Sequence, residues 1–239
     1  MNNTKADIIS RLQKEIMPLQ GFKPVSGNTG SDVLGLIKGA FPNQVFPVGA
    51  IHEFICGGEE DISASAGFIS GILSSIMKIG GISIWISRSQ NIFPPALKSF
   101  GIEPDRIIFI ELQKEKEILW VMEEALKCEG LAAVIGETPD LSFTASRRLQ
   151  LAVEQSRVTG FVIRRNPANL ATTSVSRWKI TPLPSDSDGL PGLGFPQWNV
   201  ELLKIRNGTP GKWKMEWAGR FRHIFKLSSI RAEEQRKTG

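Results

Sequence analysis

The sequence has few of the residues that build metal and redox sites. It contains 2 cysteines and 2 histidines. Cys56 and Cys128 do not form a CxxC pair, and His52 and His223 are far apart in the chain. Zinc sites need closely spaced cysteines and histidines, so we expect no metal site. We expect the two cysteines to be buried, reduced side chains of a cytoplasmic protein.

Long apolar runs are also missing. No run reaches the roughly 20 residues that a membrane-spanning helix needs. The first residues, MNNTKADIIS, lack the basic and then apolar order of a signal peptide. We therefore expect a cytoplasmic protein without membrane contact. The 239 residues suffice for one large domain with a sizeable core.

The basic residues are concentrated near the C-terminal end. The formal net charge is +5. Residues 200–239 carry ten Lys or Arg and four Asp or Glu, whereas residues 1–199 carry 19 bases and 20 acids. This distribution favours a C-terminal contact with nucleic acid or a partner over a uniformly basic DNA-binding domain.

Between residues 47 and 165, short apolar runs alternate with longer helical patterns. The expected strands are residues 50–55, 82–87, 106–110, 131–135 and 161–164, and the expected helices are residues 63–79, 95–100, 114–128 and 143–158. Continuous apolar strands of this kind predict an α/β fold, in which a mainly parallel β-sheet is flanked by helices on both faces.

The flanking regions follow other patterns. Residues 4–20 form an amphipathic helical pattern, residues 174–180 and 198–206 resemble strands, and residues 212–217 pair back as an antiparallel β-hairpin. We expect an N-terminal helix and linker at 1–24, one domain at 25–225, and a disordered basic tail at 226–239. The apolar face of the N-terminal helix could pack on its own core or mediate self-association.

A glycine-containing loop lies where a phosphate-binding loop belongs, between an apolar strand and a helix. The P-loop pattern is G-x-x-x-x-G-K-[ST]. Counted from Gly58, Ser63 replaces the second glycine, Ala64 replaces the lysine, and Ser65 keeps the hydroxyl. The degenerate nucleotide loop therefore comprises Gly57, Gly58, Glu59, Ser63, Ala64 and Ser65.

Its acidic residues oppose nucleotide binding. Glu59, Glu60 and Asp61 would face the phosphates, and one like charge 4 Å away costs about 4 kcal/mol at an effective dielectric constant near 20. Acids at this position instead favour the start of a helix. A Walker-B acid is also displaced, because Glu137 comes one place late. We therefore expect no catalytic residue, no cofactor and no ATPase activity.

Several segments resemble known proteins. The run PVGAIHEFICGGEE resembles the opening of the RecA-type ATPase core. More closely, RRLQLAVEQSRVTGFVIRR at 147–165 and PGLGFPQWNVELLKIRNGTPGKWKMEW at 191–217 resemble the ImuA family. The similarity covers about residues 25–220. It implies a RecA-like fold and a role in error-prone translesion synthesis, with protein partners that include an ImuB-like inactive relative of Y-family polymerases, a second replicative-type DNA polymerase and RecA.

Candidate contact residues for a partner or DNA lie in the C-terminal block and at one strand end. They are Lys204, Arg206, Lys212, Trp213, Lys214, Trp217, Arg164 and Arg165. The first two also resemble the K-x-R-N-G hairpin of RecA-like hexameric helicases. Alternation places Trp213, Met215 and Trp217 on one strand face, which could be a core face or a surface that stacks on bases. Arg164 and Arg165 end a strand and could line a crevice or be solvated.

Three other functions fit parts of the sequence. An active RecA-like ATPase with an atypical site has Ser65 and Glu137 as its support. A stress-induced inhibitor would bind a recombinase or cytoskeletal target. A simple DNA-binding module would show affinity that falls steeply with salt.

Overall fold

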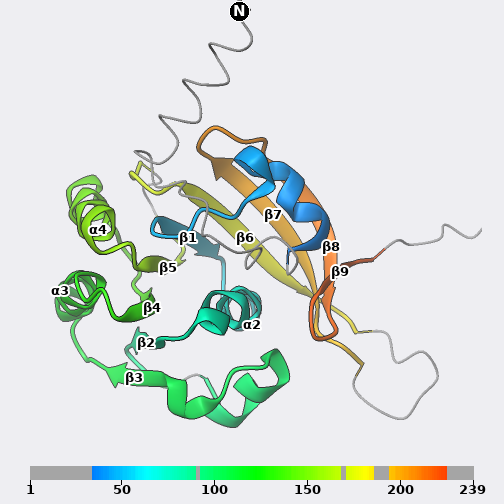
Figure 1. The fold of residues 1–239 in the computed structure, drawn as a ribbon, viewed down its shortest axis with the longest axis horizontal. Helices are drawn as coiled ribbons and strands as arrows, with labels where there is room; N and C mark the ends of the chain where they lie inside the picture. The colour runs from blue at the N-terminus through cyan, green and yellow to red at the C-terminus, as the bar shows by residue number, and fades with distance from the viewer. Residues whose placement is uncertain (1–33, 90–91, 168–170, 186–193, 225–239) are drawn as a thin grey trace, which may run out of the picture.

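The protein contains one large mixed β-sheet. The structure, a computed structural model, describes residues 34–89, 92–167, 171–185 and 194–224. The expected N-terminal helix at 4–20 and tail at 226–239 lie outside these residues. Within them, the strands form one sheet in the order β3-β2-β4-β5-β1-β6-β7-β8-β9 (Figure 1).

The first five strands form the parallel half of the sheet. They are β1 (Ile51–Cys56), β2 (Ile82–Ser87), β3 (Ile107–Glu111), β4 (Leu131–Glu137) and β5 (Thr159–Arg165). The α-helices are α2 (Glu59–Ile76), α3 (Glu115–Leu126) and α4 (Phe143–Ser156), and the 3-10 helices are η1 (Gly35–Ala40), η2 (Pro42–Gln44), η3 (Met77–Ile79), η4 (Pro94–Phe100) and η5 (Pro104–Arg106). The predicted α/β fold with a mainly parallel sheet is confirmed.

The remaining strands extend the sheet in antiparallel fashion. β6 (Ser176–Leu183) pairs parallel to β1 and antiparallel to β7 (Gln197–Ile205). β8 (Gly211–Trp217) and β9 (Phe221–His223) complete this half. The predicted antiparallel hairpin is therefore confirmed as β7–β8. β9 was not predicted, because its 3 residues are too few to show a period.

Helices cover the parallel half on both faces. Figure 1 shows α2 on one side of the sheet and α3 and α4 on the other. The face under α2 holds an aromatic cluster that spans both halves of the sheet. Gly71 of α2 allows close packing there, because a Cβ atom at this position would lie 2.8 Å from the Trp217 ring.

Two expectations about composition can be compared with the structure. Cys56 is buried, but Cys128 is exposed at the end of α3, so the prediction for Cys128 was wrong. Its apolar neighbours face the sheet while the turn after α3 points outward. In the described ranges, no helix is long and apolar enough to cross a bilayer.

A buried histidine links the sheet to the segment before β1. His52 is fully buried and stacks on Phe46, with ring centroids 4.5 Å apart. Its Nε2 donates to the Pro47 carbonyl at 2.7 Å, which leaves Nδ1 to accept from the Ser176 hydroxyl at 2.6 Å. Trp178 Nε1 donates to the same hydroxyl oxygen. Each partner is thus satisfied by neutral His52, and burial lowers its pKa from 6.5 to about 4.

This histidine should make the protein less stable in mild acid. The unfolded chain binds a proton near pH 6.5, whereas the folded chain does so only near pH 4. Stability is therefore lost as pH falls through this window, by at most about 3 kcal/mol. Urea unfolding at several pH values measures this loss. The variant His52→Gln should show a smaller slope, and equal slopes would contradict the assignment.

Candidate functional site

The loop between β1 and α2 binds its own side chains. Gly58 is the N-cap of α2, and Glu59, Glu60 and Asp61 form the first helical turn. The Gly57 N–H donates to Asp61 Oδ2 at 2.8 Å. In a phosphate-binding loop such an N–H faces the anion. Here a carboxylate of the protein occupies the position of the anion. The acids lie in the first turn of α2, as the sequence predicted.

The hydroxyl and acid that could support an ATPase are also engaged. Ser65 is fully buried, and its Oγ lies 3.3 Å from Cys56 Sγ. Glu137 accepts a 2.8 Å hydrogen bond from Trp85 Nε1. Burial raises the pKa of Glu137, although the bond from Trp85 opposes the shift. Ser65 therefore faces the core and does not line the cavity beside the loop.

A cavity of about 470 Å³ lies beside this loop, at the carboxyl ends of the parallel strands. Its charged lining residues are Glu59, Arg88, Glu115, Glu137 and Arg165. Arg165 pairs with Glu59 at 2.6 Å, and Arg88 pairs with Glu115 at 3.7 Å. Both arginines are thus paired with glutamates, and neither offers an unpaired positive charge. A polyanion is disfavoured here, since its approach must break these pairs.

Neither a lysine in the P-loop position nor a group of metal ligands among the described residues would attract a phosphate to this cavity. Ser63 is exposed at the helix start, and Ala64 is buried in the lysine position of the P-loop pattern. Across the described ranges, no group of three His, Cys, Asp or Glu side chains could hold a metal ion. The cavity therefore offers bound ion pairs, a protonatable glutamate and little free positive charge.

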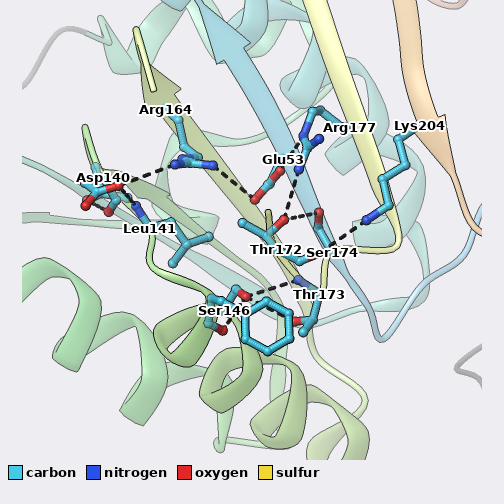
Figure 2. Close-up of polar contacts among 12 residues, drawn as sticks. Glu53, Asp140, Leu141, Ser146, Arg164, Thr172, Thr173, Ser174, Arg177 and Lys204 are labelled. Carbon is cyan, nitrogen blue, oxygen red and sulfur yellow. Dashed lines mark hydrogen bonds and ion pairs between the residues drawn. The ribbon is translucent and has the colours of Figure 1, made fainter. Parts of the chain in front are cut away.

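Figure 2 shows a second polar site, a buried charge cluster on the sheet face opposite α2. Glu53 of β1 is fully buried. Its carboxylate accepts a 2.8 Å bond from Arg177 of β6 and lies 3.5 Å from Arg164 of β5. Arg164 also lies 3.5 Å from Asp140. The cluster joins the three adjacent strands β5, β1 and β6 through direct charged contacts.

The structure corrects the expectation for two contact residues. Arg164 was a candidate surface contact, but its side chain is fully buried between Glu53 and Asp140. Arg164 precedes the exposed end of β5 by one residue and faces inward. Trp217 is also buried, and its Nε1 donates to the Ser99 carbonyl at 2.9 Å. Neither residue can contact a partner directly.

The side chains of Lys204 and Arg206 bond to the protein's own backbone. Lys204 Nζ donates to the Thr172 carbonyl at 3.3 Å, and Arg206 donates to the Thr173 carbonyl at 3.0 Å. Burial lowers the pKa of Lys204, and the nearby Arg177 charge lowers it further. The pair therefore holds the chain that leads from β5 to β6, and only part of each side chain remains accessible.

The other C-terminal candidates divide by strand face. Lys212 and Lys214 are exposed, whereas Trp213 packs partly against the core. Met215 and Trp217 on the aromatic face of β8 are buried, so this face packs on the core. Arg165 is half-exposed at the cavity, where it is paired with Glu59.

Several residues of both sites were not predicted from the sequence. Glu53 was treated as part of an apolar strand, although one acid in such a run is a signal for a buried partner. Trp85 and Asp140 gave no signal, because their roles depend on neighbours that are distant in sequence. Lys179, an exposed base on β6, was also not predicted.

Two known proteins resemble this chain over most of its length. The chain is 36% identical over 214 residues to Protein ImuA from two strains of Caulobacter vibrioides, NA1000 / CB15N and ATCC 19089 / CIP 103742 / CB 15. Each match covers 82% of this chain and 87% of the relative. No protein-family model matches.

Solved structures support the fold. A KaiC-like protein from Pyrococcus horikoshii OT3 matches with a TM-score of 0.54 and 12% identity, over 84% of this chain and all of that chain. SulA from Pseudomonas aeruginosa matches 48% of this chain at 18% identity with a TM-score of 0.42, which is too weak to bear on function. The RecA-like fold class is thus confirmed by the KaiC-like neighbour.

Proposed function

The chain belongs to the ImuA family, and we propose that it acts in a DNA-damage-induced mutagenesis system. Within that system we propose a non-catalytic role in error-prone translesion synthesis. The protein assembles polymerase partners, which are an ImuB-like inactive relative of Y-family polymerases and a second replicative-type DNA polymerase. RecA is a further candidate partner.

The observation that carries the non-catalytic role is the contact between Gly57 and Asp61. The loop N–H that would bind a phosphate is already bound by the protein's own carboxylate. The pair between Glu59 and Arg165 closes the same region from the neighbouring strand. Nucleotide binding would have to break both contacts with no lysine to compensate. These features support a scaffold on which partners assemble without ATP.

A capture experiment tests this proposal. The full chain is immobilised and offered a purified ImuB-type partner, with and without millimolar ATP and magnesium. We expect the same amount of captured partner in both conditions, no phosphate release, and no saturable heat in a calorimetric titration with ATP.

A matched variant sharpens the result. Asp61→Asn keeps the size of the side chain and removes its charge, so it should leave capture unchanged. Failure to capture the partner at micromolar concentration would contradict the assembly role. Saturable micromolar ATP binding by the unmodified chain would instead favour the ATPase alternative.

A further inference from the structure

One face of the antiparallel half carries four exposed basic side chains. They lie on β6, β8 and β9, and they are Lys179, Lys212, Lys214 and Arg222. We call them the basic face. The pairing register places them together, because Lys179 pairs opposite Glu201, which pairs opposite Lys212. Lys214 is two residues along the same strand.

The side chains of this face alternate with the core side chains. Trp178, Trp198 and Met215 point to the opposite side, where they are buried. Residues between them therefore point away from the core. α3 packs against β4 and β2, and α4 against β1 and β5, so these helices cover the parallel half. The basic face lies on the same side of the sheet but beyond them.

The face has an excess of positive charge. Its acids are Glu201 and Glu216, of which Glu201 pairs with Lys212 at 2.9 Å. Lys179, Lys214 and Arg222 form no ion pair with any other described residue. The chain continues directly from β9 into residues 225–239, which contain four Lys or Arg and two Glu. The excess of positive charge therefore continues in the sequence beyond β9.

We propose that the basic face binds the phosphate backbone of single-stranded DNA. The basic side chains are about 7 Å apart along β8 and about 10 Å apart across β6 and β8. One flexible strand can reach all of them on this open surface, whereas the curved surface of a duplex meets fewer. The aromatic rings of these strands point into the core, so binding uses phosphates and is independent of sequence.

The choice of DNA rests on the proposed role in DNA damage tolerance, but the surface does not depend on it. No contact with a polymerase partner is assumed. DNA binding and partner capture are therefore separate measurements, and failure of either one leaves the other to be judged by its own result.

The test measures fluorescence anisotropy of a labelled oligothymidine strand at salt concentrations from 50 to 200 mM. Each phosphate contact contributes about −0.7 to the slope of log K against log salt, so three or four contacts weaken binding by roughly 20- to 50-fold over this range. The variant Lys179→Gln/Lys214→Gln/Arg222→Gln retains one contact, and its affinity should change only about threefold.

A matched variant removes three positive charges from other parts of the surface. Lys78→Gln/Lys116→Gln/Arg157→Gln changes exposed bases away from the basic face. It should keep the full salt dependence, and both triple variants should retain the far-UV spectrum of the unmodified chain. The proposal is overturned by equal slopes in the two variants, by no binding at 50 mM salt, or by tighter binding to duplex DNA. Equal affinity for polyglutamate would assign the face to acidic protein segments and would also overturn it.

Discussion

Replacing Glu53 by glutamine is expected to lower the free energy of unfolding by about 3–5 kcal/mol. The substitution keeps the size of the side chain and removes the one charge that two buried guanidinium groups share. Arg177 loses a charged 2.8 Å bond and Arg164 loses a partner at 3.5 Å. Arg164 keeps Asp140, whose side chain is 76% exposed and therefore stabilises it weakly. Two buried cations would then repel each other.

Urea unfolding at pH 7 measures the effect of Glu53→Gln. The control is Glu103→Gln, which breaks an ion pair with Lys98 at 3.4 Å. Both partners of that pair are more than 60% exposed, so the loss should be below about 0.5 kcal/mol. A similar small loss for Glu53→Gln would mean that water reaches the cluster and replaces the missing charge. Replacing the buried residues Glu53, Arg164 and Arg177 together by methionine should recover part of the loss, because no buried charge is left unpaired.

This cluster also shows where prediction from the sequence ends. The strands of the parallel half are short and continuously apolar, and the helices between them have a clear period, so both could be predicted. Glu53 lies within such a run, and its value depends on Arg164 and Arg177, which are more than 100 residues away. No local pattern connects these positions. Register between β1, β5 and β6 is needed to bring them together.

The loop after β1 was easier to predict. Its chemistry depends on neighbouring residues, so the missing lysine and the added acids could be identified in the sequence. The specific contact of Asp61 with Gly57 could not, although both residues lie in the predicted loop. For the basic side chains the reverse holds. Their charge is visible in the sequence, but only the fold shows that Lys214 is exposed, whereas Lys204 is half-buried and bonds to the Thr172 carbonyl.

Replacing Trp178 by alanine is expected to lower the free energy of unfolding by about 3–5 kcal/mol, through the loss of packing and not of charge. Trp178 lies on β6, at the junction of the parallel and antiparallel halves. It is fully buried and stacks on Phe54, with ring centroids 6.2 Å apart and planes at 10°. It also contacts Phe68 of α2 at 5.6 Å. The deletion opens a large apolar cavity and leaves Ser176 without the donor that orients it toward His52.

Two variants separate the cavity from the hydrogen bond. Trp178→Phe keeps most of the ring volume and should lose about half as much stability as Trp178→Ala. Trp120→Ala removes a tryptophan that is 60% exposed on α3, and it should change stability by less than about 0.5 kcal/mol. Urea unfolding compares the three. Equal losses for Trp178→Ala and Trp120→Ala would show that the aromatic cluster does not hold the two halves together.

The space that Trp178→Ala leaves in the core predicts which part of the protein opens first. β6 is the strand that joins β1 to β7, and α2 packs on it from the side of Trp178. Loss of this side chain should weaken the attachment of β7, β8 and β9 more than the pairing of β4 with β5. Amide hydrogen exchange in Trp178→Ala should therefore accelerate in the antiparallel half and stay slow in β4 and β5. Because β8 and β9 carry most of the basic face, the same variant should bind single-stranded DNA more weakly even at temperatures where the parallel half remains folded. Uniform acceleration across all strands would instead mean that the sheet unfolds as one unit.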